Sequence, residues 1–211
     1  MSRPPFLAVL DIEHIDPYPW TAIPPHDGGD DMLEEWDDIR AWCREEAEDL
    51  WADRELDPGP DGIDVVAATL TRCAETFSPL GTNHWLFLHR DHPLDVPLPV
   101  LAAIGPSSEP RDETLRALTM ADDPAAVEPP VVKPFVSRRL GKGLTTFRYV
   151  PQDDSPRLIA CVRYAWQLDE PGADVVLWTA TEDVTRLMAA AADLEELAHS
   201  LTVYDPWADD V

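Results

Sequence analysis

The chain has 211 residues, of which 45% are hydrophobic, and its 41 acidic and 16 basic residues give a formal charge of −25. The apolar residues suffice for one globular core, but a field this negative repels phosphate backbones and anionic lipid surfaces, which excludes nucleic acid and membranes as expected partners. No apolar run approaches the roughly 18 residues that a membrane-spanning helix requires.

The cysteines predict reduced thiols rather than disulfides or a metal site. Cys43, Cys73 and Cys161 are odd in number, far apart and without metal-binding or redox spacing. The apolar stretch that follows the N-terminus is too short for the core of a secretion signal. We therefore expect a cytoplasmic protein, and no motif predicts a cofactor.

The first part of the chain predicts one strand and two helices. Apolar residues that recur every three or four positions indicate the helices, and acidic residues suit their N-termini. In chain order we expect a strand at 6–12, a proline-rich segment at 16–25 that cannot form a helix, a helix that starts near Asp30 or Asp31 and ends before 57–60, and a helix that follows Asp61 and ends at 78–81.

The rest of the chain is dominated by predicted strands. The segment 158–168 alternates, so that Leu158, Ala160, Val162, Tyr164, Trp166 and Leu168 share one face. We expect strands at 84–89, 96–104, 131–138, 144–150, 158–168 and 175–180, a short helix at 111–120, and a last helix that Thr181 caps and that extends to Leu201.

This order of elements predicts an α+β fold. Consecutive strands joined by short turns favour a mainly antiparallel sheet, here of about six to seven strands, with helices on its faces. No repeat or linker divides the chain. We therefore expect a single domain over 1–204, followed by a loose acidic tail at 205–211.

The pattern resembles the Mog1/PsbP-like fold as it occurs in actinobacterial proteins, some of them encoded near type VII secretion genes. The resemblance is carried by the segment 20–24 before paired helices, the strand pair at 84–104, and the short stretches Asp122-Asp123-Pro124, Arg148-Tyr149-Val150-Pro151 and Leu177-Trp178-Thr179-Ala180-Thr181. It implies a seven-stranded antiparallel sheet between helices and a non-catalytic role. Mog1 binds a small GTPase and PsbP a photosystem, but no binding residue of either can be matched here.

One short segment has the composition of a metal site. His89, Asp91, His92 and Asp95 offer imidazole and carboxylate ligands within seven residues. The alternative is a polar turn, because Arg90 lies inside the group and Pro93 would shape the turn.

Charge is segregated along the chain. Residues 1–57 hold seventeen acids and four bases, whereas 129–152 hold no acid and five bases, which are Lys133, Arg138, Arg139, Lys142 and Arg148. This basic band either offsets the acidic helix of the same molecule or binds a partner. As a partner we consider another protein or the acidic helix at 34–55 of a second copy, which would form a homodimer.

One tryptophan is a candidate for a second interface. Trp36 and Trp51 fall on or beside the apolar stripe of the first helix, but Trp42 lies about 120° away from it on a helical wheel. An exposed tryptophan of this kind is typical of protein interfaces.

These observations favour a non-enzymatic protein-interaction module that uses the basic band and Trp42. The first alternative is a metal-dependent enzyme built on the His89–His92 turn. The second is a small-molecule carrier whose pocket lies between sheet and helices, lined by Tyr164, Trp166 and Trp178.

Overall fold

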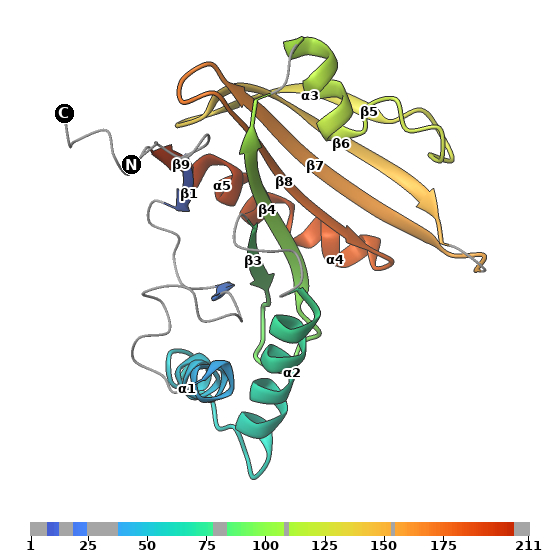
Figure 1. Cartoon of the computed structure of the whole chain (residues 1–211). Coiled ribbons are helices and arrows are strands. Elements are labelled where there is room, and N and C mark those ends of the chain that lie inside the picture. The colour runs from blue at the N-terminus through green and yellow to red at the C-terminus, as the bar shows by residue number, and fades with distance from the viewer. Residues whose placement is uncertain are drawn as a thin grey trace, which may run out of the picture. The chain divides into compact units, whose positions relative to one another are not determined.

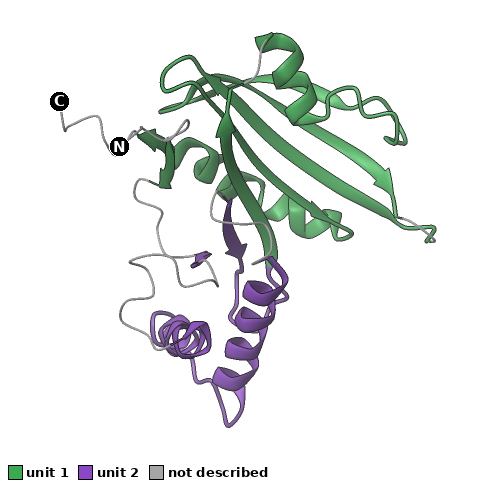
Figure 2. Cartoon of the chain, viewed as in Figure 1, with its two compact units in different colours: residues 1–16, 98–211 green, residues 17–97 purple. Residues whose placement is uncertain are grey.

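The computed structural model describes residues 8–12, 19–24, 38–77, 84–107, 110–152 and 155–204. The chain divides into two compact units, a larger one of residues 1–16 and 98–211 and a smaller one of residues 17–97 (Figure 2). We describe each unit separately, and the single domain predicted over 1–204 stays a prediction. The predicted tail lies outside the described residues. Within the described part, no helix has the length and apolar character needed to cross a membrane.

The larger unit contains an antiparallel sheet in the order β4-β8-β7-β6-β5 (Figure 1). A separate antiparallel pair joins the two ends of the chain, β1 (Val9–Ile12) and β9 (Leu201–Tyr204). The strands of the main sheet are β4 (Leu98–Pro106), β5 (Val131–Ser137), β6 (Gly141–Pro151), β7 (Leu158–Leu168) and β8 (Ala173–Thr181). β5 ends this order, and it contains Pro134.

Helices lie on both faces of this sheet (Figure 1). On one face α3 (Arg111–Thr119) contacts β6 and β7, and its Leu115 packs with Ala165 and Val176. On the other face α4 (Val184–Ala189) contacts β7 and α5 (Ala191–Ser200) contacts β5. Because side chains alternate along each strand, neighbouring residues of β7 meet different helices.

The smaller unit combines an antiparallel strand pair with two helices. β2 (Trp20–Ile23) pairs with β3 (His84–His89), and α1 (Ile39–Ala52) packs against α2 (Gly62–Phe77). Asp38 caps α1, because its carboxylate accepts the N–H groups of Arg40 and Ala41 at 2.8 and 2.9 Å. An ion pair of 2.8 Å between Arg44 and Asp64 links the two helices.

The predicted α+β class is confirmed. Every described strand pair is antiparallel, and the strands outside the β1–β9 pair number seven, within the expected six to seven. Several details differ from prediction. Residues 20–23 of the proline-rich segment form the strand β2, for which no strand was predicted. α1 begins after Asp38. Asp183, and not Thr181, caps the last helix, because its carboxylate accepts the N–H of Arg186. This helix is interrupted at Ala190, and Leu201 begins a strand instead of ending it. The predicted starts at Asp30 and Asp31 lie outside the described residues.

Candidate ligand pocket

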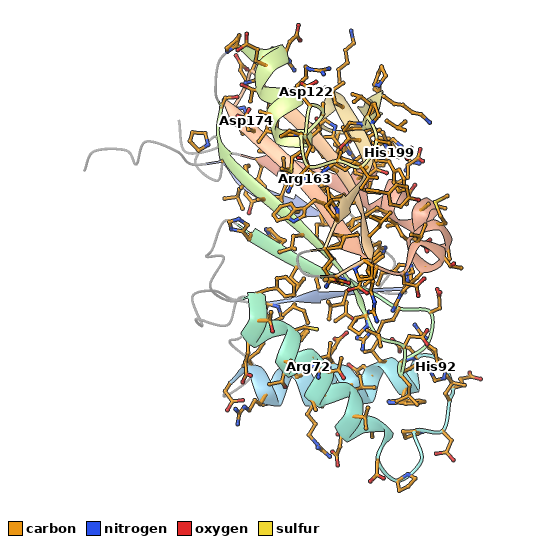
Figure 3. All side chains as sticks on the ribbon, turned by 90° about the vertical axis from the view of Figure 1, so that its right-hand side faces the viewer. Arg72, His92, Asp122, Arg163, Asp174 and His199 are labelled. Carbon is orange, nitrogen blue, oxygen red and sulfur yellow. The ribbon has the colours of Figure 1, made fainter. Side chains whose placement is uncertain are left out.

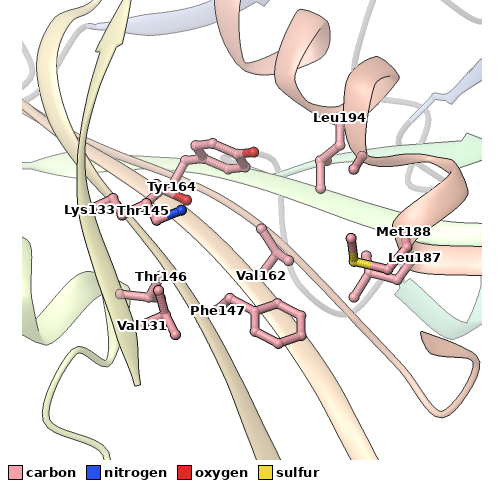
Figure 4. A pocket seen from close by; sticks show the side chains of 11 residues that line it. Val131, Lys133, Thr145, Thr146, Phe147, Val162, Tyr164, Leu187, Met188 and Leu194 are labelled. Carbon is pink, nitrogen blue, oxygen red and sulfur yellow. The ribbon is translucent and has the colours of Figure 1, made fainter. Parts of the chain in front are cut away.

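The larger unit has a pocket between its sheet and the helices α4 and α5 (Figure 4). Its volume is about 420 Å³. That size lies within the roughly 300–1,000 Å³ that is typical of small-molecule sites. The pocket therefore has room for an organic ligand.

Two rows of side chains cross the sheet beneath the pocket. The strand register aligns Val131, Phe147 and Val162 across β5, β6 and β7, and we call these three residues the apolar row. Two positions along, the register aligns Lys133, Thr145 and Tyr164, which we call the polar row. All six residues line the pocket. The sheet thus offers a hydrocarbon surface beside a strip that carries an amine and two hydroxyls.

The helices supply the opposite wall, which is entirely apolar. Leu187 and Met188 come from α4, and Ala191 and Leu194 come from α5. Figure 4 shows Leu187, Met188 and Leu194 facing the strands across the cavity. Leu187 and Leu194 are buried, whereas Met188 is 62% exposed and Val131 across from it is 50% exposed. The two leucines therefore form the buried part of the helix wall, and the exposed lining residues Met188, Val131 and Lys133 border the mouth.

Tyr164 keeps its phenolic proton at neutral pH. Burial, followed by the nearby Glu195 carboxylate, raises the pKa of Tyr164 to about 12, although a side-chain hydrogen bond with Thr145 acts in the opposite direction. A protonated phenol both donates and accepts hydrogen bonds. The polar row can therefore offer donors to a bound group without releasing a proton.

A cluster of rings lies beside the polar row. The ring of Phe135 lies 4.8 Å from Tyr164, 5.7 Å from Trp166 and 5.0 Å from His199 between centroids. His199 Nδ1 accepts the backbone N–H of Arg138 at 3.3 Å. These contacts join the β5–β6 turn to α5 and keep the sheet and helix walls together at this end.

The structure separates the five residues of the predicted basic band. Lys133 lines the pocket, and Arg139 and Lys142 are exposed at the β5–β6 turn. Arg138 forms a two-pronged ion pair with Glu196, with distances of 2.7 and 3.0 Å. Arg148 is buried and binds Asp123 through Nε at 2.8 Å. The band is therefore not one surface, and we correct the placement of Arg148 in it, because alternation on β6 turns this side chain toward the α3 face.

The prediction that Trp42 is an exposed interface residue is wrong. Trp42 is only 7% exposed and belongs to the buried side of α1, together with Ile39, Cys43, Ala47 and Trp51. Ile39 and Trp42 are three residues apart, which puts them on one helical face. The buried face of α1 is therefore wider than the stripe predicted from apolar residues at steps of three and four. Trp36 lies outside the described residues.

The residues of the predicted metal site do not form one. His89 is buried in β3, where its ring lies 5.0 Å from that of Trp20. His92 lies in the following turn (Figure 3), its Nδ1 accepts the N–H of Leu94, and its ring lies 5.6 Å from Trp51. Within the described ranges, no three His, Cys, Asp or Glu side chains gather in a metal-binding arrangement. Asp91 and Asp95 belong to the polar turn that was the alternative reading.

The carrier hypothesis named one pocket residue correctly. Tyr164 lines the pocket, but Trp166 is fully buried beside it and Trp178 lies on the opposite face, packed against the α3 cluster. The alternation of β7 was enough to place Val162 with Tyr164. Nothing in the sequence pattern of the last helix distinguished the wall residues Leu187 and Leu194 from ordinary core residues.

Comparisons with known proteins give weak likenesses only. No protein-family model and no curated protein matches the chain. Among solved structures the chain is similar to LpqN of Mycobacterium tuberculosis, which is involved in cell envelope biogenesis. The two proteins are 10% identical, and the TM-score is 0.46. The alignment covers 95% of this chain and 86% of LpqN.

The Ran-binding protein Mog1p of Saccharomyces cerevisiae has 8% identity over 61% of this chain and 82% of its own, with a TM-score of 0.38. A point mutant of Mog1 is 10% identical, with 59% of this chain and 76% of the Mog1 chain covered and a TM-score of 0.33.

Proposed function

We propose that the protein is a non-enzymatic binding module whose larger unit holds an apolar small molecule between the sheet and the helices α4 and α5. The observation that carries this proposal is the pocket itself. Its helix wall and one of its two sheet rows are apolar, and the cavity has about 420 Å³ of space. A carrier of this kind is the second alternative that the sequence offered.

The free energy of binding would come from hydrocarbon contact. Removal of apolar surface from water contributes about 25 cal/mol per Å², or about 0.8 kcal/mol for each buried methylene group. An apolar ligand of six to eight carbon atoms would therefore gain roughly 5 kcal/mol before the cost of immobilisation. Micromolar affinity then needs either a longer chain or polar contacts in addition.

The lining favours binding over catalysis. The described residues that line the pocket offer it the hydroxyl groups of Thr145 and Tyr164, but no His, Cys or carboxylate. A hydroxyl nucleophile needs an adjacent general base, and the imidazole or carboxylate that most often serves is absent from these residues, which leaves Lys133 as the one basic side chain. The hydroxyl of Thr146 points to the opposite face of the sheet, where it donates to the carbonyl oxygen of Thr119 at 2.6 Å.

A neutral fluorescent probe tests the proposal. N-phenyl-1-naphthylamine should brighten on addition of the full chain, because its fluorescence rises in an apolar site. The substitution Val162→Trp fills the pocket from its sheet side and should weaken binding at least about tenfold, which corresponds to about 1.4 kcal/mol.

The matched control is Val136→Trp, which makes the same change at an exposed position of β5 outside the pocket. This variant should bind the probe like the wild type. Circular dichroism should establish that both variants are folded. If the wild type leaves the probe dark, or if Val162→Trp binds it unchanged, the proposed function is rejected.

A second proposal keeps the interaction role that the sequence suggested. It is favoured by the exposure of Arg139 and Lys142 at the β5–β6 turn and by the exposed Glu45, Glu48 and Asp49 on α1, which are complementary to them in charge. We propose that this turn binds an acidic protein surface, with α1 of a second copy as the specific case. Exposed pairs contribute only about 0–1 kcal/mol each, so such a contact would be weak and salt-sensitive.

Light scattering at low ionic strength tests this second proposal. The wild type should form a dimer that the double substitution Arg139→Glu and Lys142→Glu dissociates. Charge reversal at Arg72 and Arg157 is the matched control and should leave the mass unchanged. A wild type that remains monomeric at every concentration would reject self-association through this turn.

A further inference from the structure

Lys133 is the one charged side chain among the described residues that line the pocket. The whole chain has only two lysines, Lys133 and Lys142, whereas its other basic residues are arginine. No described carboxylate lies within ion-pair distance of Lys133, although acids outnumber bases 41 to 16 in the sequence. In an acidic protein, a cation beside an apolar cavity requires an explanation.

The neighbours of Lys133 would suit an anion. Thr145 lies directly across from it on β6, and Tyr164 lies across from Thr145 on β7. Figure 4 shows Lys133 and Thr145 together on the strand side, with the Tyr164 ring beside them. An ammonium group has three donors, and each hydroxyl has one. Hydrogen bonds to an ionised acceptor are roughly twice as strong as those between neutral groups.

We propose that the ligand of this pocket is a monomeric aliphatic carboxylate, whose chain lies between the apolar row and the helix wall and whose carboxylate is held by Lys133, Thr145 and Tyr164. This inference rests on the proposed function and adds the chemical class of the ligand. The order of the two rows along the strands sets the direction of the chain. Its polar end lies at the polar row, where Lys133 is exposed, and its tail runs along the apolar row between Val131 and Met188.

Two carboxylates of α5, those of Glu195 and Glu196, interact with residues at the polar-row end of the pocket or beside it. Glu196 is neutralised by its two-pronged pair with Arg138. Glu195 is exposed, acts electrostatically on Tyr164 and lies 3.9 Å from His199 Nε2. Its negative charge opposes a bound carboxylate. Removal of this charge should therefore strengthen carboxylate binding and leave a neutral ligand unaffected.

The overall charge of −25 lets an effect of Lys133 be distinguished from nonspecific binding. A nonspecific apolar site in such a protein would prefer a cationic amphiphile, because the average field attracts it. At physiological ionic strength, charges more than about 8 Å away are largely screened. A preference for the anion would therefore report the local contribution of Lys133.

Calorimetric titration of the full chain with three ligands of equal chain length is the test. Dodecanoate, dodecanol and dodecylamine are added below their aggregation concentrations. The wild type should bind dodecanoate most tightly. The substitution Lys133→Met keeps the length of the side chain and removes its charge, and should weaken dodecanoate about tenfold while dodecanol binds as before.

Two further variants complete the design. Lys142→Met makes the identical change at the exposed turn and should alter neither ligand. Glu195→Gln should tighten dodecanoate by a few-fold and leave dodecanol unchanged. Lengthening the carboxylate by one methylene should tighten binding about fourfold until the cavity is filled.

The outcomes separate the inference from the function on which it rests. Dodecanol and dodecanoate could bind equally tightly, both to the wild type and to Lys133→Met. The pocket would then bind the hydrocarbon chain without distinguishing the head group. This result would overturn the inference and leave the proposed function intact. Dodecylamine as the tightest ligand, or binding only above the aggregation concentration, also overturns it. If none of the three ligands binds, the proposed function itself fails.

Discussion

The two faces of the larger unit's sheet are built from the same strands and differ in how completely helices cover them. On the α3 face, Leu115, Ala165 and Val176 are buried together, with Leu118, Leu144 and Trp178 packed around them. On the other face, α4 and α5 leave a cavity of about 420 Å³. We call them the closed face and the hollow face.

Polar contacts account for part of the difference. The C-terminal end of α3 is tied to the sheet by side chains of the strands. Thr146 donates to the carbonyl oxygen of Thr119, and Arg163 Nη1 donates to that of Leu118 at 3.1 Å (Figure 3). Orphan carbonyls at a helix end are thereby satisfied, and the helix is held down. On the hollow face the break at Ala190 divides the cover into two short helices, which place only a few side chains over the strands.

The largest effect we predict is on the hollow face, where one position has no free space. A Cβ atom at Gly143 would lie 2.2 Å from the carbonyl oxygen of Ala165 and 2.7 Å from Trp166 Cδ1. Because the first of these is backbone, relief requires the strands to move. Gly143→Ala should lower the free energy of unfolding by about 3 kcal/mol or more, as measured in urea.

Gly105→Ala is the control for this substitution, because its added Cβ meets no atom within 4 Å. Its effect should be within about 1 kcal/mol. A Gly143→Ala variant as stable as Gly105→Ala would show that β6 and β7 are less closely packed at this point than the structure indicates.

The next effect concerns the ion pair on the closed face. The side chains of Arg148 and Asp123 are only 6% and 8% exposed. Loss of one partner leaves the other buried and uncompensated, at a cost of about 3–5 kcal/mol. Asp123→Asn should therefore destabilise the chain by about 3 kcal/mol at pH 7. Arg157→Gln, which breaks an exposed pair with Glu182, should cost less than about 1 kcal/mol.

The same pair makes stability depend on pH. The N–H of Ala125, and after it the hydrogen bond from Arg148, lowers the pKa of Asp123 below its usual value in spite of burial. A carboxyl with a lowered folded-state pKa stabilises the fold fully above its unfolded pKa of about 4, and this contribution is lost as pH falls through the folded-state value. Acid titration of stability should accordingly be shallower in Asp123→Asn than in the wild type. Equal slopes would contradict the assignment.

The last prediction compares one truncation on each face, of which that on the hollow face has the smallest expected effect. Leu115→Ala removes a side chain that is 7% exposed on the closed face and should cost about 2–4 kcal/mol. Met188→Ala, at the mouth of the hollow face, should cost less than about 0.5 kcal/mol because this side chain is already 62% exposed. The faces would not differ as described if both variants melted at the same temperature.

The strands could be predicted because their signal is local. Alternation gave the bounds of β7 at Leu158 and Leu168, and it placed Tyr164 and Val162 on one face. Turn residues likewise gave β3 from His84 to His89. Period-two patterns depend on neighbours along the chain, so one sequence is enough to read them.

The sequence offered a pocket between sheet and helices as one alternative but could not distinguish it from a filled core, because a cavity depends on how far apart two packed elements lie. Leu187 and Leu194 look like core residues in the sequence, and they are buried. They line a pocket because space separates them from Val162, and the periodicity of a sequence does not indicate such a distance. The ion pairs that divide the basic band could not be predicted either. They join residues that are distant in sequence, Arg138 to Glu196 and Arg148 to Asp123.

Pro134 has a consequence for how copies of this protein can associate. It lies in β5, the terminal strand of the larger unit's sheet, and a proline has no N–H to give to a further strand. Proline and lysine at a sheet edge discourage another chain from adding its own strand there, and here Lys133 precedes Pro134. The strand that forms one wall of the pocket thus resists edge-to-edge pairing, and self-association through this edge would have to use side chains rather than a continued sheet.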